Sequence, residues 1–403
     1  MIECRTIKEM CSIVVDCPHS TPTWTATGKI VVRNNNIKNG RIDFSSPSYT
    51  DDEHFQQRIK RATPQGGDII ITREAPMGEV GMIPDGITCC LGQRMVLLRA
   101  NPDICDNYYL LYSLQSKYVQ HQISWSEGTG TTVSNLRIPH LEQLKIPYLP
   151  LSKQRQVSSI LRCLEEKAEQ NRVINDNLYE MVNAYYASLF KDVECEMTTI
   201  GNYAERIYSG GTPTTSNATY WDGSFGWFSS GETRNRFVIS TEKTITQAGI
   251  DNSSTKLAAK HDIVMASAGQ GFTRGQTSML LLDTYVNQSV IVIHAERNIL
   301  PYLFWNLANR YEELRAISDS SSIRGSLTTK MIASFEIPLA NEESLQAFAN
   351  FSWSVIPQIE NNLLENERLA ALRDSLLPKL TSGELDVRNI NLAGHQLWQE
   401  AIP

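Results

Sequence analysis

The chain has 403 residues, which is enough for two or three domains that each have a hydrophobic core. Its composition, 41% hydrophobic and 20% charged with a net charge of −7, is ordinary for a soluble protein. A lone DNA-binding protein is usually basic on one face, so binding of nucleic acid by this chain would need help from partner subunits. No apolar run approaches the roughly 20 residues of a membrane span, and we expect no signal peptide because the N-terminal residues lack an apolar stretch.

The eight cysteines argue against a disulfide framework or a zinc site. They form no CxxC pair and no set with histidine at zinc-binding spacing. We therefore expect reduced, mostly buried thiols in a cytoplasmic protein. The excess of acidic residues lies at the C-terminal end, where residues 340–403 hold nine acidic and four basic side chains.

Residues 1–148 predict a mixed α/β globule with short strands. The strand candidates are Lys29–Arg33, Asp68–Ile71, Gly78–Ile83 and Arg94–Leu98. Turns are indicated by the three asparagines at 34–36 and by Asn39-Gly40. One helix is predicted over Tyr108–Gln122.

Residues 150–190 predict one long helix. Apolar residues recur three and four positions apart, there is no glycine, and the only proline is at the start. If fully helical, the segment would be roughly 60 Å long, which exceeds an ordinary globular helix and suits a coiled coil.

Residues 192–338 repeat the plan of the first globule. The matching segments are Thr21-Pro22 with Thr212-Pro213, Asp68–Ile70 with Asp262–Val264, Gln93–Val96 with Asn287–Val290, and the helix Tyr108–Gln122 with a helix predicted over Leu300–Tyr311. The offset is 191 for the first pair and 194 for the next two. The two globules therefore share a fold but differ in their surface residues.

The long helix also occurs twice. Residues 341–381 match residues 150–190 at an offset of 191 without a gap, and the Ile-Pro dipeptide before each helix matches as well. Each helix has an apolar row that contains one asparagine, Asn171 in the first and Asn362 in the second. A single asparagine in an apolar seam fixes the register of a coiled coil. Two unrelated amphipathic helices are the alternative interpretation.

We expect the two helices to pair in antiparallel fashion, so that their midpoints meet. Asn171 and Asn362 should then hydrogen-bond across the seam. Pro357 lies within the second helix and is expected to kink or interrupt it. Such a helix pair would act as a ruler between targets bound by the two globules.

Several motifs resemble the specificity (S) subunit of type I restriction–modification systems. Ile146–Gln154 is similar to the family's IPLPPLxEQ entry to its first helical region, although Lys153 replaces the usual Glu. Leu372–Leu380, followed by Ser382-Gly383-Glu384, is similar to the family's distal ending. Segments that resemble target recognition domains are 16–22, 67–74, 211–213, 220–221 and 225–227.

The resemblance implies an α+β fold with two mixed α/β target recognition domains, separated by two long helices that form an antiparallel coiled coil in an internal pseudo-twofold repeat. The expected divisions are a first target recognition domain at 1–148, a central helix at 149–191, a second recognition domain at 192–338, a distal helix at 339–388 and a tail at 389–403.

The resemblance also implies partners. These are double-stranded DNA with a bipartite asymmetric site, two methyltransferase (M) subunits and restriction/translocase (R) subunits. S-adenosylmethionine and methylation of adenine N6 would belong to the M subunits. This chain would hold no cofactor and no metal, and it would not be an enzyme.

The sequence lacks complete catalytic motifs, which also favours a non-catalytic chain. The only approach to the Asn/Asp-Pro-Pro-aromatic loop of adenine methyltransferases is Asn101-Pro102-Asp103, which lacks the second proline. Gly269–Gly275 resembles a nucleotide-binding turn, but its glycine spacing is wrong and no Walker lysine follows. A flexible loop is the better interpretation of this segment. A catalytic methyltransferase or nuclease, and a coiled-coil scaffold that binds only proteins, are the competing hypotheses.

Candidate DNA-binding residues are polar side chains in loops that suit phosphates or base edges. In the first globule they are Arg33, Asn35, Lys38, Arg73, Gln93, Arg94 and Thr131. In the second they are Ser229, Arg234, Arg236, Gln270, Arg274, Gln288, Ser322 and Arg324. The equivalence of loops between the globules favours Arg73, Arg94, Gln270 and Gln288. Trp221 and Trp227 are expected in the core.

Overall fold

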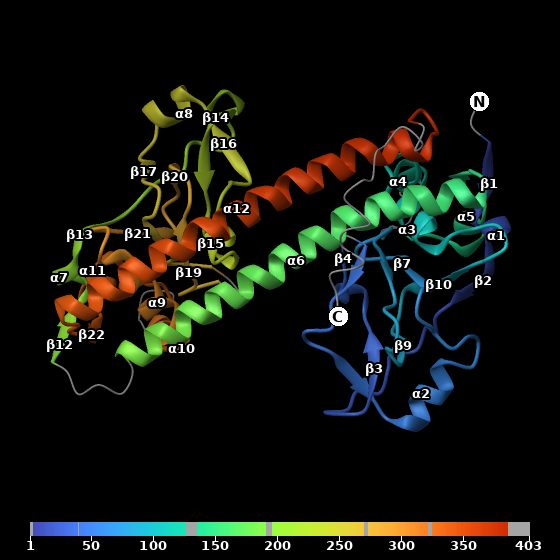
Figure 1. The fold of residues 1–403 in the computed structure, drawn as a ribbon, viewed down its shortest axis with the longest axis horizontal. Coiled ribbons are helices and arrows are strands. Elements are labelled where there is room, and N and C mark those ends of the chain that lie inside the picture. Colours follow the sequence, from blue (N-terminus) through green and yellow to red (C-terminus); the bar gives the residue numbers. More distant parts are fainter. Residues whose placement is uncertain are drawn as a thin grey trace. The chain divides into compact units, whose positions relative to one another are not determined.

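The computed structural model describes residues 3–38, 40–125, 135–190, 196–269, 273–320 and 325–385. The chain divides into two compact units (Figure 1). Unit 1 contains residues 1–167 and 368–403, and unit 2 contains residues 168–367. Both units combine helices with sheets, which confirms the predicted α+β class.

Unit 1 is built on a main sheet with strand order β2-β10-β7-β8 and a second sheet with order β6-β3-β9. The strands are β1 (Cys4–Thr6), β2 (Cys11–Asp16), β3 (Lys29–Val32), β4 (Ile37–Lys38), β5 (Arg41–Ile42), β6 (Ser48–Thr50), β7 (Ile69–Thr72), β8 (Val80–Met82), β9 (Cys89–Leu91), β10 (Met95–Ala100) and β11 (Lys145–Pro147). The helices are α1 (Ile7–Met10), the 3₁₀ helix η1 (Asn34–Asn36), α2 (Asp52–Arg58), α3 (Asn107–Gln115), α4 (Lys117–Ser124) and α5 (Ile138–Gln143).

Unit 2 has a main sheet with order β13-β21-β18-β19-β15 and a second sheet with order β16-β14-β20-β17. The strands are β12 (Met197–Thr199), β13 (Ala204–Ser209), β14 (Trp221–Phe228), β15 (Phe237–Val238), β16 (Lys243–Ile245), β17 (Lys256–Ala258), β18 (Ile263–Ala266), β19 (Thr277–Leu280), β20 (Thr284–Val286), β21 (Val290–Ala295) and β22 (Glu336–Pro338). The helices are α7 (Ile200–Tyr203), the 3₁₀ helices η3 (Ala218–Tyr220) and η4 (Ser230–Arg234), α8 (Gln247–Asp251), α9 (Leu300–Asn309), α10 (Tyr311–Ser320) and α11 (Thr329–Ala333).

The main sheets confirm the repeat that the sequence offsets predict. Strands β13, β21, β18 and β19 stand in the same order as β2, β10, β7 and β8. The Ile-Pro dipeptides lie on equivalent strands, β11 and β22, where Ile146 and Ile337 are fully buried. The strand predictions in residues 1–148 are confirmed by β3, β7, β8 and β10.

The predicted helix over Tyr108–Gln122 is wrong in one respect, because two helices cover this segment. Ser116 has extended backbone angles and ends α3. Its side chain also accepts a hydrogen bond from the backbone N–H of Val119 and so begins α4. The second globule shows the same break, since α9 ends at Asn309 and α10 begins at Tyr311.

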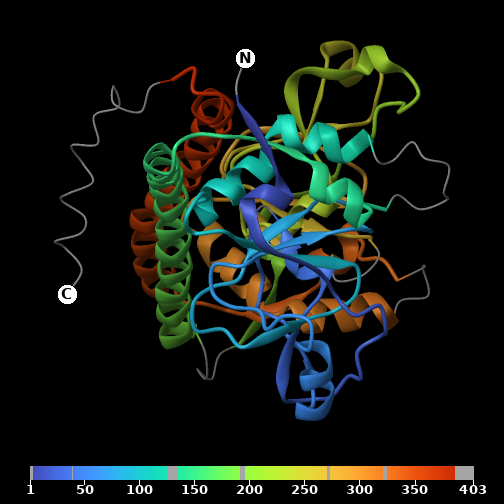
Figure 2. The same cartoon turned by 90° about the vertical axis from the view of Figure 1, so that its right-hand side faces the viewer.

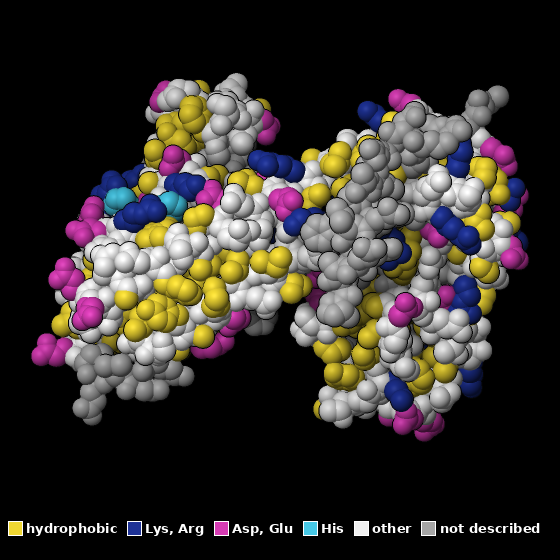
Figure 3. All heavy atoms as spheres, viewed as in Figure 1, with side chains coloured by type: hydrophobic (Ala, Val, Ile, Leu, Met, Phe, Trp, Pro, Cys, Tyr) yellow, Lys and Arg dark blue, Asp and Glu magenta, His cyan; other side chains and the backbone are white. Residues whose placement is uncertain are grey.

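The long helices are α6 (Leu151–Phe190) and α12 (Glu342–Thr381), and they confirm the predictions for 150–190 and 341–381. Each unit contains one end of each helix, and within a unit the two segments lie side by side and antiparallel (Figures 1 and 2). In unit 2, Val173, Ile174 and Met181 of α6 are exposed, and apolar side chains gather over this helix in Figure 3.

The expected interruption at Pro357 is wrong, because α12 continues through this residue, whereas the expected kink stays a prediction. The fixed φ of proline is compatible with a helix, but proline lacks the N–H that would bond to Trp353 O, and its ring crowds that carbonyl. Ile356 and Ile359 flank the proline and are both 1% exposed. Their burial stabilises the turn and offsets the lost bond.

The expected hydrogen bond between Asn171 and Asn362 is also wrong in its partners. Asn171 donates to Asn366 Oδ1 at 3.0 Å, and Asn362 donates to Asn175 Oδ1 at 2.7 Å. The same offset of 191 relates Asn175 to Asn366. Two equivalent pairs therefore flank the midpoint, because the helices are staggered by one turn relative to the predicted register.

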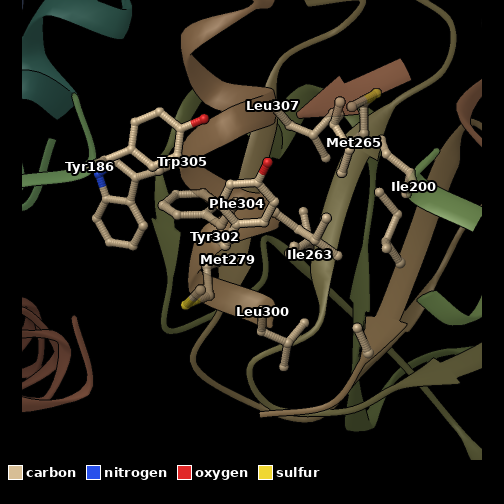
Figure 4. Packing of buried hydrophobic residues seen from close by; sticks show 14 of the residues in the cluster. Tyr186, Ile200, Ile263, Met265, Met279, Leu300, Tyr302, Phe304, Trp305 and Leu307 are labelled. Atoms are coloured by element: carbon tan, nitrogen blue, oxygen red, sulfur yellow. The ribbon is translucent and has the colours of Figure 1, made fainter. Parts of the chain in front are cut away.

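Each unit buries its helix segments in its own core. In unit 2, Tyr186 of α6 packs with Trp305 and Tyr302 of α9 and with the main sheet (Figure 4). Phe348 of α12 belongs to the same cluster and contacts the rings of Tyr186 and Trp305. In unit 1, Val157 and Leu161 of α6 join Leu377 and Leu380 of α12 in the core cluster. These contacts anchor the long helices to the globules through apolar burial.

Candidate nucleic-acid interface

In both units the candidate residues gather mainly at one end of the main sheet. In unit 1, β2 and β7 end where β10 begins, since Asp16 pairs with Val96 and Thr72 pairs with Met95. In unit 2, β13 and β18 end where β21 begins, since Ala266 pairs with Val290. Loops from distant parts of the sequence therefore meet at this end.

In unit 1 these loops form one connected surface, which we call the unit 1 loop cluster. It comprises residues 16–21, η1, residues 73–79, residues 92–94 and residues 135–136. Asn34 of η1 donates to the carbonyl oxygen of Ala75 at 2.7 Å. Arg73 N–H donates to Arg94 O at 2.8 Å, and Gln93 donates to the carbonyl oxygen of His19.

The buried side chain of Arg58 hydrogen-bonds to backbone carbonyl oxygens of this cluster. The Arg58 guanidinium donates to the carbonyl oxygens of Leu91 and Gly92, each at 2.8 Å, and to those of Pro18 and Ser20. Arg58 is 8% exposed, and burial lowers the pKa of its guanidinium. The four bonds fix two separate segments of the loop cluster relative to each other.

Arg73 and Arg94 have different environments, although both are candidates for DNA contact. The Arg73 side chain is 12% exposed and bonds to Asp16 at 2.9 Å, to Asn135 at 3.1 Å and to Leu136 O at 2.9 Å. Its guanidinium therefore ties three protein segments together. The Arg94 side chain is 54% exposed and approaches Glu74 at 3.3 Å.

Arg94 also has an uncommon backbone conformation. Its φ of 64° lies in the left-handed region, which is rare for residues other than glycine and asparagine. The hydrogen bond from Arg73 N–H to Arg94 O holds this conformation. Positions of this kind gather at functional sites, where the surrounding structure fixes an exposed side chain.

The other unit 1 candidates lie at the surface of the cluster or outside the described residues. Arg33, Asn35 and Lys38 are exposed on or beside η1. Gln93 is half-buried, and its amide also approaches Thr21 Oγ1 at 3.4 Å. Thr131 lies outside the described residues.

In unit 2 the equivalent surface, the unit 2 loop cluster, comprises residues 210–214, η4, residues 267–269 and 273–276, residues 287–289 and residue 325. Ser267 N–H donates to Ser289 O at 2.9 Å, and Thr212 Oγ1 donates to Gln288 Oε1. The second bond matches that between Gln93 and Thr21 in unit 1. The Thr-Pro motif therefore meets the same loop in both units.

Arg274 plays in unit 2 the part that Arg73 plays in unit 1. Its side chain is 16% exposed, and it bonds to Asp319 at 2.6 Å, to Ser318 and to the carbonyl oxygen of Gly325. It thereby fixes the segment after α10, just as Arg73 fixes the segment after α4. The sequence offset alone aligns Arg73 with Ser267, so the two arginines occupy the same role from different positions.

The remaining unit 2 candidates are divided. Ser229 precedes η4 and donates to Glu232, and exposed Arg234 pairs with Glu242. Arg236 lies away from the cluster, against α6, where it contacts Asp176 at 3.6 Å and stands 4.2 Å from the Tyr179 ring centre. Gln288 is exposed. Gln270, Ser322 and Arg324 lie outside the described residues.

Sequence reasoning missed several residues of the unit 1 site. Asp16 and Asn135 are the partners of Arg73, and Glu74 lies between Arg94 and Asn135. Trp24 is 47% exposed beside Arg33. Its place two residues after the Thr-Pro motif was the available signal. Trp227 is buried as expected, and Trp221 packs edge-on against it at 5.0 Å.

Metal-binding groups and membrane-spanning helices are both absent from the residues that the structure describes. No group of three or more His, Cys, Asp or Glu side chains there could hold a metal ion. Among the same residues, none of the helices is both long and apolar enough to cross a membrane.

Comparison with known proteins supports the repeat. The model of the type I restriction modification DNA specificity domain matches residues 3–178 and again residues 193–369. The chain is 28% identical over 246 residues to the type I restriction enzyme EcoR124I/EcoR124II specificity subunit of Escherichia coli. That match covers 58% of each protein, which is less than two thirds of the relative's length.

Two further relatives match over more of their length. The chain is 21% identical over 345 residues to the type I restriction enzyme MjaIX specificity subunit of Methanocaldococcus jannaschii, covering 80% of this chain and 79% of the relative. The crystal structure of a type I restriction–modification S subunit from M. genitalium has a TM-score of 0.58 at 17% identity, covering 94% of this chain and 96% of that one. The two matches to the domain model span most of the sequence, and the chain belongs to the family of type I restriction–modification DNA specificity proteins.

Proposed function

We propose that the chain is the DNA sequence-specificity subunit of a type I restriction–modification complex. Its target would be a bipartite asymmetric site in double-stranded DNA, with one part read by the unit 1 loop cluster and the other by the unit 2 loop cluster. The carrying observation is that the specificity-domain model matches twice, over residues 3–178, which include the unit 1 loop cluster, and over residues 193–369, which include the unit 2 loop cluster. The same scaffold thus presents two different sets of side chains, which suits two different half-sites.

The chain itself would be non-catalytic. Two M subunits would bind S-adenosylmethionine and methylate adenine N6, and R subunits would join for cleavage. The exposed apolar residues Val173, Ile174 and Met181 on α6 support docking of a partner subunit on the helices. On this proposal the recognition domains are residues 1–148 and 192–338, the helical regions are 149–191 and 339–388, and residues 389–403 form a tail.

The test is to co-express the chain with its M subunit in a host that lacks adenine methylation and to map methylated adenines across the genome. A single two-part sequence with an unread spacer is expected. Gln288→Ala should change the preferred bases in one half only, because Gln288 belongs to the unit 2 loop cluster. The chain purified alone should neither methylate nor cleave DNA.

The competing function is a coiled-coil scaffold that binds only proteins. It predicts a stable complex with the M subunit but no sequence preference in the methylation map. Methyl transfer by the purified chain would instead identify an enzyme and overturn the proposal.

A further inference from the structure

Beside the unit 1 loop cluster is a hollow that none of the candidate residues except Arg33 touches. Its lining includes Trp24, Thr25, Arg33, Pro47, Ser48 and Tyr49, and its volume is about 360 Å³. We call it the Trp24 hollow. The Trp24 side chain is 47% exposed, and the guanidinium carbon of Arg33 lies 5.4 Å from its ring centre.

The position of Trp24 is fixed by hydrogen bonds on both sides of it. Buried Thr50 donates its hydroxyl to Thr23 O at 2.8 Å, and Thr25 N–H donates to Tyr49 O at 3.0 Å. Gly28 has a φ of 139°, and a Cβ there would lie 2.4 Å from Thr50 O, so the segment approaches β6 as closely as a glycine allows. The exposed indole is therefore presented by an ordered backbone.

The Trp24 hollow is continuous with the unit 1 loop cluster. Arg33 directly precedes η1, and its N–H donates to Asn36 Oδ1 at 2.9 Å. The next residue, Asn34, donates to the loop at Ala75. A duplex that lies on the exposed candidates Asn35 and Arg94 would therefore extend toward the hollow.

The charge of the hollow favours an anion. None of its lining side chains is acidic. Arg33 forms no ion pair among the described residues, in contrast with Arg94, which approaches Glu74, and Arg73, which binds Asp16. A guanidinium offers several donors in one plane, which match the oxygens of a phosphate.

The indole calls for an apolar or planar partner beside that phosphate. Burial of its exposed face is favourable, because it removes apolar surface from water. A deoxyribose ring next to a phosphate supplies both properties at the spacing of one nucleotide. The hydroxyl groups of Ser48 and Tyr49 add donors for further backbone oxygens.

We propose that the Trp24 hollow binds the sugar–phosphate backbone of duplex DNA, with the indole against a deoxyribose and Arg33 on the adjacent phosphate. This inference rests on the proposed function. The contact carries no sequence information and instead positions the duplex so that the unit 1 loop cluster can reach base edges.

The experiment measures binding of the complex with its M subunits to a labelled duplex that carries the methylated sequence, over a series of salt concentrations. Arg33→Ala should weaken binding and reduce the slope of log K against log salt by about 0.9, the value for one lost phosphate contact. Trp24→Ala should weaken binding roughly tenfold without changing the slope. Trp24→Phe and Arg33→Lys should restore much of each loss.

Lys29→Ala is the matched control. Lys29 begins β3, the strand that ends just before Arg33. It does not line the hollow and is 3.7 Å from Asp52, so its loss should leave the salt slope unchanged. The losses of affinity in Trp24→Ala and in Arg33→Ala should each be the same for half-sites of different sequence. Thermal unfolding of each variant should match that of the wild-type complex, because Trp24 and Arg33 are exposed.

Three results would contradict the inference. Unchanged affinity and slope in both Trp24→Ala and Arg33→Ala would show that the hollow does not touch DNA. A loss confined to particular bases would mark base reading or stacking on an unpaired base. An equal change in Lys29→Ala would reduce the effect to net charge. A wild-type complex without sequence preference would contradict the proposed function itself. This failure is distinguishable from failure of the present inference, because the wild-type measurement alone shows it.

Discussion

Asn171 donates its side-chain amide to Asn366 Oδ1 across the seam between α6 and α12, at 3.0 Å. Asn366 in turn donates to the carbonyl oxygen of Ala168, and Asn175 donates to the carbonyl oxygen of Ile359. The offset of 191 that relates the two helices also relates these bonds. With the bond from Asn362 to Asn175, these make four amide bonds that follow the repeat, and each amide finds its partner at one register only. Asn171 also donates to Glu365 Oε2 at 2.6 Å, a bond without a counterpart because Ile174 stands at the equivalent position.

This arrangement predicts strong coupling between the two residues of one pair. Asn171 is fully buried, so Asn366→Leu would leave a buried amide with fewer partners and should cost about 1–3 kcal/mol in free energy of unfolding. The double variant Asn171→Leu, Asn366→Leu should be more stable than the sum of the single changes predicts, because both polar groups are then removed.

Urea unfolding of the wild type, Asn171→Leu, Asn366→Leu and the double variant measures the coupling. The cycle through Asn175 and Asn362 is the matched control and should give a coupling of the same sign. Additive single changes at both pairs would show that the bonds do not set the register.

The structure separates two arginines that the sequence treats alike. Arg73→Ala should lower the stability of unit 1 by about 1–3 kcal/mol, because Asp16 and Asn135 lose their donor. It should also weaken reading of one half-site, through displacement of the loops. Arg94→Ala should weaken DNA binding by about 1–3 kcal/mol if the side chain reads a base, and it should leave stability nearly unchanged.

Melting curves and binding to duplexes with altered half-sites distinguish the two roles. Asp16→Asn is the control for Arg73, since it breaks the same ion pair from the other side. A stable Arg73→Ala variant with a pure binding defect would contradict the positioning role.

The sequence predicted the elements that depend on periodic burial. The spacing of apolar residues gave α6 and α12 nearly to the residue, and the offsets of 191 and 194 gave the repeat of the main sheets. Periodicity succeeds here because a long helix must place an apolar row in the core whatever its neighbours are. It did not give the break at Ser116, where one side chain both ends α3 and caps α4.

The candidate site was predicted less completely because its contacts join residues far apart in sequence. Arg73 meets Asn135, which is 62 positions away, and Gln93 meets Thr21, which is 72 positions away. Residue type alone could not show that Arg73 is mostly buried and hydrogen-bonds to other loop segments, whereas the Arg94 side chain is exposed. The same limit explains Arg236, whose guanidinium lies against Tyr179 of α6 and not in the loop cluster.

A buried ion pair at the opposite end of the unit 1 sheet offers a test of local stability. Arg99 bonds to Asp68 at 2.7 Å and to Thr63 O at 2.9 Å, and the Asp68 side chain is 3% exposed. The hydrogen bond to Asp68 raises the pKa of Arg99. Arg99→Met would leave the Asp68 carboxylate buried without its cation, which should cost about 3–5 kcal/mol in free energy of unfolding.

Arg155→Met is the control, because Arg155 is exposed. It should change the free energy of unfolding by less than about 0.5 kcal/mol. Hydrogen exchange of the amides in β7 and β10 locates the effect in unit 1. Equal protection in Arg99→Met and wild type would contradict the importance of the pair.

The lowered pKa of His261 in unit 2 predicts how the free energy of unfolding depends on pH. On the left of Figure 3, where unit 2 is drawn, His side chains lie among Lys and Arg side chains. Burial of His261, together with the charges of Arg297 and Lys260, lowers its pKa below the ordinary value of 6.5, while Glu360 and Asp283 act in the opposite direction. Its ring centre lies 4.7 Å from that of Trp353 on α12.

Because the folded chain holds His261 neutral, the unfolded chain binds a proton more readily. The stability associated with the neutral imidazole is complete above the unfolded pKa of 6.5 and is lost as the pH falls from there through the lower pKa of the folded chain. His261→Asn should make the stability of unit 2 less dependent on pH below 6.5, since asparagine does not titrate and tolerates the φ of 78°. Urea unfolding at a series of pH values, with His261→Gly as the control for backbone strain, measures this change. The same dependence on pH in wild type and both variants would show that His261 carries a proton as readily in the folded chain as in the unfolded one.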